Sequence, residues 1–362
     1  MAVNVRFDKL IYPPYSSTIL VRRINQIMKA LSKIKEWTNV DFNQFHNQIV
    51  PLNKPAVLRS LVADWPMVEA AKRSTGEAVS YLKSFDNKTP LYTIVGEPAI
   101  NRRFFYRDDL QGVNFQRTQA TLTTVLDNLL ALMNSQTPHA IAIQAASVRD
   151  SLPGFDDANK LPLLEDSVAP TMWLGNSAVV APHFDVHDNI ACVVTGRRRF
   201  TLFPPEQIAN LYVGPTLDAP GGVPISMVDL HEPDLDRYPN FSKALCVAQQ
   251  ALLEPGDAIF IPTPWWHAVE SLDQVNVLIN YWWGGLDQGA LSPNQSLLHS
   301  MLTIAKLSPA QRESWRHFFD YFVFKTSGDP AAHLPYELND IVTTLSPAQK
   351  KNVYEFLKDH LK

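Results

Sequence analysis

Two histidines and one aspartate are spaced so that they could bind a divalent metal ion. His183 and Asp185 stand two positions apart in a segment rich in β-branched residues, and residues two apart on an extended strand point to the same face. His267 follows a second such segment, after the turn at Pro255 and Gly256. Two imidazoles and one carboxylate with open positions are the ligand set of non-haem Fe(II) oxygenases. His183 and Asp185 alone also fit a simple hydrogen-bonded pair, so the metal hypothesis depends on the downstream histidine.

An arginine on the following segment could hold an anionic ligand on the same face. Thr195 and Gly196 are predicted to form a two-residue hairpin turn, which would pair Val193 with Arg198. Arg198 then faces the same side as His183, on two otherwise apolar strands. A buried guanidinium needs a carboxylate partner, and a dicarboxylate ligand would supply one through a bidentate pair. The alternative is that Arg198 is an exposed member of a run of three arginines.

The segments that carry these residues indicate a β structure with helical additions. From about residue 138 to 285, short β-branched and aromatic runs alternate with Pro, Gly, Asp and Asn, a pattern typical of an antiparallel barrel or sandwich. An amphipathic helix is predicted over residues 16–36, and a second helical pattern covers residues 122–133. After Gly289 the chain is predicted to be helical again. The expected class is therefore mainly β with α additions.

The predicted C-terminal helices share a repeated start. Leu-Ser-Pro-Ala-Gln occurs at residues 307–311 and 345–349, where serine suits the N-cap and proline the first helical position. Each repeat opens a helix with large apolar side chains, among them Trp315 and Phe318 in the first and Phe356 in the second. Such faces are expected to be buried either on the barrel or in a dimer interface.

Composition excludes several classes of protein. The 362 residues include 32 basic and 36 acidic side chains, and this net charge of −4 argues against bulk binding of nucleic acid or of an anionic membrane. Two cysteines, Cys192 and Cys246, cannot build a disulfide framework, and they fit a reducing compartment. No apolar run is long enough to span a bilayer, and the first residues lack the apolar stretch of a signal peptide. We therefore expect a cytoplasmic protein without a membrane span.

Several motifs together resemble one enzyme family. They are the segment 182–205, the Trp-Trp-His-Ala-Val-Glu-Ser block at 265–271 with the Pro-Gly-Asp turn before it, Asn-Tyr-Trp at 280–282, and the segments 53–59, 64–66 and 173–175. They resemble the JmjC/cupin-like Fe(II)- and 2-oxoglutarate-dependent oxygenases, in particular the branch containing the asparaginyl hydroxylase that inhibits hypoxia-inducible factor. The resemblance covers roughly residues 40–285 and implies a double-stranded β-helix, also called a jelly-roll or cupin barrel. It divides the chain into an N-terminal helical extension (1–37), an oxygenase domain (38–289) and a C-terminal helical segment (290–362).

The resemblance also assigns roles to individual residues. Three residues match the iron ligands: His183, Asp185 and His267. Four match groups that hold 2-oxoglutarate: Arg198 at its distal carboxylate, and Asn189, Asn280 and Gln144 along the pocket.

Two positions depart from the family pattern. Ala142 stands where the related hydroxylase has a tyrosine that contacts the cosubstrate, and Val180 stands where it has a threonine. Cosubstrate anchoring must therefore be partly rebuilt, and the substrate is not carried over. His187, near the first two ligands, is an alternative ligand in place of His183 or a group on the substrate side.

The implied reaction consumes 2-oxoglutarate and O2, releases succinate and CO2, and hydroxylates a C–H bond of a protein or peptide side chain. Hydroxylation of a small metabolite or of a nucleic-acid base is an alternative within enzymes. A non-catalytic cupin-like binding module is a second alternative, and a cupin isomerase or dioxygenase that needs no 2-oxoglutarate is a third. The C-terminal helices stand in the place of that branch's dimerisation helices, so a homodimer is implied.

Overall fold

A computed structural model describes residues 31–215, 219–284, 292–335 and 346–360. The chain divides into two compact units, Met1–Gly285 and Leu286–Lys362. The division lies a few residues before position 290, where the C-terminal helical segment is predicted to begin.

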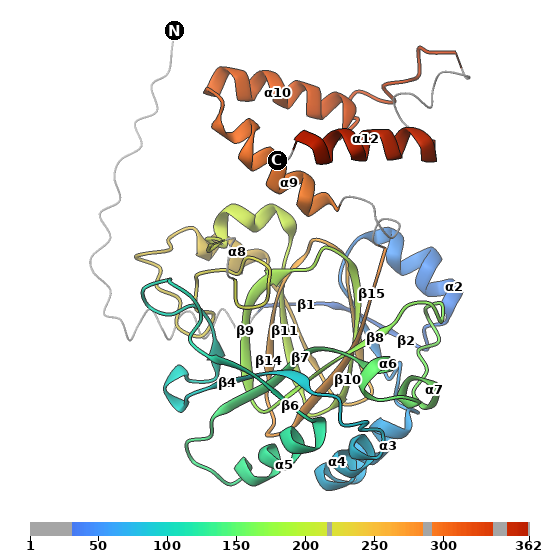
Figure 1. The fold of residues 1–362 in the computed structure, drawn as a ribbon, viewed down its shortest axis with the longest axis vertical. Coiled ribbons are helices and arrows are strands. Elements are labelled where there is room, and N and C mark those ends of the chain that lie inside the picture. Colours follow the sequence, from blue (N-terminus) through green and yellow to red (C-terminus); the bar gives the residue numbers. More distant parts are fainter. Residues whose placement is uncertain (1–30, 216–218, 285–291, 336–345, 361–362) are drawn as a thin grey trace. The chain divides into compact units, whose positions relative to one another are not determined.

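Eight strands form the barrel of the first unit. They are β8 Pro170–Gly175, β9 Ala178–Phe184, β10 Asp188–Thr195, β11 Arg198–Phe203, β12 Gln249–Leu253, β13 Ala258–Ile261, β14 Trp266–Ser271 and β15 Asn276–Trp283. Of these, β8, β9, β10, β11, β14 and β15 are labelled in Figure 1. One sheet contains them in the order β13-β10-β15-β8 and the other in the order β12-β11-β14-β9. Successive strands therefore lie in opposite sheets, apart from β11 and β12. This arrangement is a double-stranded β-helix, which confirms the predicted jelly-roll with helical additions.

Further strands widen both sheets. The six-stranded sheet gains β1 (Ser32–Lys33) beside β12 and β5 (Arg103–Phe104) beside β9. The nine-stranded sheet gains β3 (Ala56–Arg59) and β2 (Lys35–Thr38) on one edge, and β7 (Ala140–Ser147), β4 (Leu91–Gly96) and β6 (Gln116–Ala120) on the other.

The described part of the predicted N-terminal helix is a pair of strands. β1 and β2 pair in parallel with β12 and β3. Ile34, which helical spacing assigns to an apolar helix face, is instead buried between the sheets with Phe200 and Leu253. The prediction is wrong for residues 32–36, because pairing with a sheet edge satisfies their backbone while it buries Ile34. Residues 16–30 of that helix, and most of the predicted extension 1–37, lie outside the described residues.

The nine-stranded sheet is covered on both faces. On β10, Ala191 and Val193 face the barrel interior, whereas Ile190, Cys192 and Val194 pack into a second cluster that helices complete. The helices of that layer are α3 (Pro66–Arg73), α4 (Thr75–Ser84), α5 (Leu122–Leu132), α6 (Val148–Ser151) and α7 (Phe155–Ala158). Because both faces are covered, β10 is a continuous apolar run that rigidly supports the residues at its two ends.

The helix α5 confirms the helical pattern predicted over residues 122–133. Thr121 caps it, since its side chain accepts a hydrogen bond from the backbone N–H of Thr124. Leu122, Val125 and Leu126 are buried at helical spacing. The remaining short elements of this unit are α2 (Phe42–Gln44), a π-helical turn (Phe45–Ile49), 3-10 turns at Val50–Leu52, Pro98–Ile100 and Pro205–Asn210, and α8 (Phe241–Val247).

The predicted hairpin between β10 and β11 does not form. β10 pairs with β13 and β15, and β11 pairs with β12 and β14, so the connection through Gly196 crosses from one sheet to the other. Gly196 has a φ of +70°, and a side chain there would collide with Asn276, which explains the glycine. The prediction is wrong about the partner strands because a short connection in a jelly-roll can change sheets. Its conclusion about direction survives, since Arg198 still faces the interior.

The second unit contains the helices α9 (Pro293–Leu302), α10 (Pro309–Phe322) and α12 (Pro347–His360), with a 3-10 turn at Ile304–Lys306. Both predicted repeat starts are confirmed. Ser308 and Gln311 form a capping box at α10, and the Ser346 hydroxyl accepts a hydrogen bond from the backbone of Gln349 at α12. No helix within the described ranges has the length and apolar character needed to cross a bilayer.

Candidate metal and cosubstrate site

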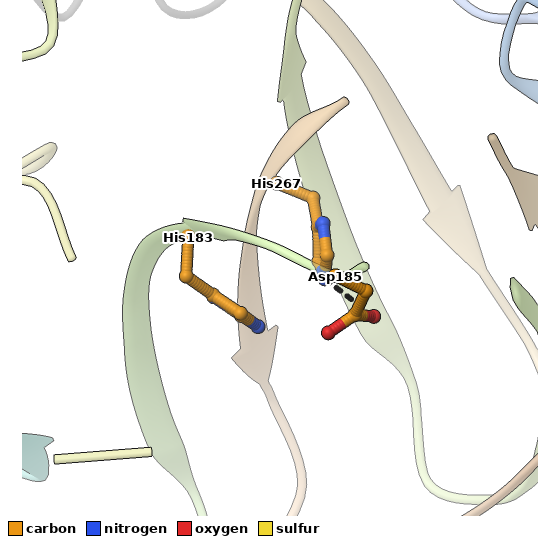
Figure 2. Close-up of side chains that lie close together, drawn as sticks. All are labelled: His183, Asp185 and His267. Carbon is orange, nitrogen blue, oxygen red and sulfur yellow. Dashed lines mark ion pairs between the residues drawn. The ribbon is translucent and has the colours of Figure 1, made fainter. Parts of the chain in front are cut away.

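The three predicted metal ligands lie together inside the barrel. His183 is on β9, Asp185 follows that strand directly, and His267 on β14 lies opposite His183 in antiparallel register. The two imidazole rings have centroids 4.2 Å apart, and Nε2 of His267 is 3.7 Å from Oδ2 of Asp185. One ligand atom from each residue lies within 4.8 Å of the others, and the side chains point toward one another (Figure 2). This cluster can hold a single metal ion.

Backbone carbonyls orient both imidazoles for metal binding. Nδ1 of His183 is 2.9 Å from the carbonyl oxygen of Ala181, and Nδ1 of His267 is 3.2 Å from that of Trp265. When each Nδ1–H donates to its carbonyl, the Nε2 lone pair is left for a metal. Burial and the neighbouring His183 lower the pKa of His267 well below its usual range. His267 is therefore neutral at physiological pH, which is the protonation state of a ligand.

The carboxylate of Asp185 is held by a chain of side-chain hydrogen bonds. Its Oδ2 accepts from Asn189 Nδ2 and from Trp282 Nε1, each at 3.1 Å. Asn280 Nδ2 donates to Asn189 Oδ1 at 3.2 Å, and Trp173 Nε1 donates to Asn280 Oδ1 at 2.8 Å. Oδ2 is thus engaged by protein donors, whereas no described residue donates to Oδ1. The network fixes the orientation of the carboxylate beside the two imidazoles.

Besides Asp185, this network contains two residues to which the resemblance assigns a role and two motif residues, Trp173 and Trp282, to which it assigns none. Asn189 and Asn280, which the resemblance matches to the cosubstrate pocket, line the cavity and also orient Asp185. Trp282 is expected from the sequence to lie in the core or the cleft wall, and its hydrogen bond to Asp185 is not predicted. A signal was present, because Trp282 stands two residues after Asn280 and so shares its face of the strand.

Three consecutive arginines have different environments. Arg197 forms an ion pair with Asp273 at 2.8 Å, and Arg199 forms one with Glu270 at 3.0 Å. Arg198 is only 7% exposed. It has no carboxylate partner among the described residues, its Nε has no hydrogen-bond partner there, and its Nη2 lies 3.5 Å from the carbonyl of Trp173. Burial lowers the pKa of Arg198 to about 10, so it stays protonated at neutral pH. This unpaired buried cation fits an anionic ligand.

A cavity of about 340 Å³ joins the metal cluster to Arg198, a size that suits a small ligand. All seven predicted site residues line it: His183, Asp185, His267, Arg198, Asn189, Asn280 and Gln144. Its apolar wall includes Ala191, Phe200 and Ile261. Val193 and Ile259, further apolar residues of these strands, are buried in the same interior cluster.

The two departures from the family pattern also lie in the cavity wall. Ala142 and Val180 contribute aliphatic groups there. Gln144 lies on the same strand as Ala142 and precedes Ala145, whose φ of +50° and shifted pairing with β8 mark a bulge. His187 lines the cavity as well, but the metal cluster contains His183 and not His187.

Comparison with known proteins identifies the class. Residues 42–288 match the cupin-like domain family, and the chain belongs to that family. Its curated relatives include "Lysine-specific demethylase JMJ31" of Arabidopsis thaliana, 31% identical over 153 residues, which are 42% of this chain and 26% of that protein. "HSPB1-associated protein 1" of Homo sapiens is 41% identical over 120 residues, covering 31% and 23%. "JmjC domain-containing protein D" of Dictyostelium discoideum is 27% identical over 248 residues, covering 64% and 52%.

These relatives support a JmjC/cupin oxygenase of the Fe(II)- and 2-oxoglutarate-dependent type at the level of the family. The matched stretches span about a quarter to a half of the relatives' own lengths. The closer relation to the asparaginyl hydroxylase branch stays a prediction.

The residues present fit the cofactors of that family. Two imidazoles and one carboxylate oxygen are a suitable donor set for Fe(II), and they would leave coordination positions open for a cosubstrate and O2. The guanidinium of Arg198, which has no carboxylate partner among the described residues, fits the distal carboxylate of 2-oxoglutarate in the same cavity.

Proposed function

We propose that the protein is an Fe(II)- and 2-oxoglutarate-dependent hydroxylase that acts on a side chain of a protein or peptide. One observation carries the proposal: the buried, unpaired Arg198 shares a single cavity with the His183, Asp185 and His267 cluster. A metal site alone would suit many cupins. A metal site combined with a lone buried cation suits a metal ion that binds an anionic cosubstrate.

The chain's own residues position and protect the reaction. Fe(II) with 2-oxoglutarate and O2 would supply the oxidising power for C–H hydroxylation, with succinate and CO2 as coproducts. His183, Asp185 and His267 hold the metal, and Asn189 with Trp282 keeps Asp185 in one orientation. Arg198 neutralises the distal carboxylate of the cosubstrate, and the apolar wall excludes water.

The charge of the cavity favours an uncharged target group. Among its described lining residues, Asp185 and Arg198 are the two with permanent formal charge, and both have roles toward metal and cosubstrate. A cationic lysine side chain would enter without a free carboxylate to compensate its desolvation. Hydroxylation of an uncharged side chain is therefore preferred. Demethylation of a methylated lysine is the second candidate, which the names of two relatives favour.

A turnover experiment tests the proposal and separates it from a binding module. Succinate formation from 2-oxoglutarate is measured with added Fe(II), in air and under anaerobic conditions, for the wild type, Arg198→Met and Arg197→Met. We expect the wild type to form succinate in air and not under anaerobic conditions. Arg198→Met should lose this turnover, and Arg197→Met should retain it because its exposed ion pair contributes little. Equal succinate formation with and without O2, or turnover that survives in Arg198→Met, contradicts the proposal.

The target is identified by peptide capture. Protein loaded with Mn(II) and a 2-oxoglutarate analogue is used to enrich peptides, and enriched peptides are then treated with the Fe(II) enzyme and analysed by mass spectrometry. A gain of one oxygen on an uncharged side chain supports the proposal. Loss of a methyl group from lysine supports demethylation instead, and turnover stimulated solely by metabolites or bases contradicts a protein substrate.

The location proposed for the protein is the cytoplasm. Cys192 is buried and Cys246 exposed, and neither forms a disulfide. A reducing compartment would keep the exposed thiol free. Fractionation with an antibody against the chain tests this, and recovery in an oxidising compartment contradicts it.

A further inference from the structure

We infer that Ser271 is a second group for the distal carboxylate of 2-oxoglutarate and helps Arg198 to select a dicarboxylate over a monocarboxylate. This inference rests on the proposed function. Ser271 is the last residue of β14, and it lies directly opposite Arg198 of β11 in the antiparallel ladder. Directly opposite residues share a face, with Cβ atoms about 5 Å apart. Both side chains line the same cavity.

The hydroxyl of Ser271 is available for a ligand. Its backbone carbonyl accepts a hydrogen bond from the Ser177 hydroxyl at 3.0 Å, which fixes the main chain at this position. No described residue forms a hydrogen bond with its own hydroxyl. A short side chain on a fixed strand loses little conformational entropy when it binds.

No other described side chain of this wall offers a hydroxyl. Among the described residues that line the cavity, Ser271 has the one side-chain hydroxyl. Ala142 and Val180, where the resemblance expects tyrosine and threonine, are aliphatic, and so is Val269, which lines the cavity from the same strand as Ser271. A carboxylate has about four lone-pair sites, so one guanidinium leaves acceptor capacity unused. Ser271 can donate to such a site.

The chemistry of the two groups defines the selectivity. Both Arg198 and Ser271 are donors toward the carboxylate farthest from the metal, whereas the 2-oxo acid end needs only the metal and the residues around it. Loss of either donor should weaken binding of 2-oxoglutarate. It should not weaken binding of 2-oxopentanoate, which has the same 2-oxo acid end and no distal carboxylate.

Calorimetric titration of the Mn(II)-loaded full chain tests this without relying on turnover. 2-Oxoglutarate and 2-oxopentanoate are each titrated into the wild type, Ser271→Ala, Ser271→Thr and the control Ser242→Ala, which changes an exposed helical serine. We expect Ser271→Ala to bind 2-oxoglutarate about 10-fold more weakly, the loss of one hydrogen bond to a charged group. Its affinity for 2-oxopentanoate should not change. Ser271→Thr, which keeps the hydroxyl, should stay within about threefold of the wild type, well under the loss of that bond.

The possible results separate this inference from the proposed function. If the wild type does not bind 2-oxoglutarate, the proposed function itself fails. If it binds and Ser271→Ala binds equally well, the role of Ser271 alone is refuted. Equal weakening of both acids, or equal weakening by threonine and alanine, shows a packing role and also refutes it.

Discussion

Replacement of Arg198 by methionine should affect ligand binding and the stability of the ligand-free protein in different ways. The guanidinium is buried, and no carboxylate pairs with it among the described residues. Methionine keeps much of the apolar stem and removes the charge. We therefore expect Arg198→Met to lose binding of 2-oxoglutarate while the ligand-free protein keeps or gains stability.

The magnitude follows from the pKa of Arg198, which burial lowers from 12.5 to about 10. This shift corresponds to roughly 3 kcal/mol of destabilisation of the charged form. That value is an upper bound on the free energy of unfolding that the protein can gain when the charge is removed. Because the pKa of Arg198 is lower in the folded state than in the unfolded state, its charge destabilises the fold. The cost is fully present below pH 10 and fades as the pH rises toward the unfolded value. Lost contacts of the arginine stem offset part of the gain.

Urea unfolding at neutral pH measures both effects when Mn(II) is present throughout and 2-oxoglutarate is either added or left out. Saturating ligand at 100 times its Kd should raise the free energy of unfolding of the wild type by about 2.7 kcal/mol. It should leave Arg198→Met unchanged. Without ligand, the free energy of unfolding of Arg198→Met should lie between that of the wild type and about 3 kcal/mol above it. Arg197→Met should behave like the wild type in both conditions.

One result would refute this reasoning. Removal of one member of a paired buried charge costs about 3 to 5 kcal/mol. If Arg198→Met loses that much stability without ligand, Arg198 has a protein partner in solution. Its role as a free anchor for a carboxylate is then wrong, whatever the metal site does.

Three further predictions concern the metal, the cavity wall and the second unit. Trp282→Phe removes a donor to Asp185 and should weaken Mn(II) binding about 10- to 100-fold with an unchanged circular dichroism spectrum; unchanged affinity would show that the bond is incidental. Val180→Thr adds a hydroxyl to the cavity wall and should raise the calorimetric affinity for 2-oxoglutarate up to about 10-fold, whereas a fall in affinity would place the carboxylate elsewhere. A chain ending at residue 289 should be monomeric by light scattering if the C-terminal helices form the predicted homodimer, and a truncated dimer would exclude them as the interface.

Strand periodicity accounts for how much of the site could be predicted. Residues two positions apart on a strand lie on the same face of the sheet, whichever strand pairs with theirs. The direction of Asp185 relative to His183 could therefore be deduced without the topology. The direction of Arg198 rests on the predicted hairpin, and it is correct although that hairpin does not form. The partner strands of β10 could not be deduced, because the sequence of the short connection through Gly196 is compatible both with a hairpin and with a change of sheet.

Contacts between distant segments could not be predicted from the sequence. The bond from Trp173 to Asn280 exists because β8 pairs with β15, which no local pattern specifies. Ile34 shows the same limit in the other direction. Its helical spacing with upstream residues is real. Residues 32–33 nevertheless pair with the edge of β12, and Ile34 is buried in the barrel interior, so tertiary contacts override the helical pattern.

The central claim is that Asp185, with two histidines, holds the iron on which turnover of 2-oxoglutarate depends. The most direct test measures, in one experiment, the Fe(II) bound per chain and the succinate formed in air by the wild type and by Asp185→Ala. Asp157→Ala, an exposed carboxylate outside the cavity, is the matched control. We predict that the wild type and Asp157→Ala bind one Fe(II) and form succinate, whereas Asp185→Ala does neither. An Asp185→Ala protein that retains both iron and turnover would contradict the account.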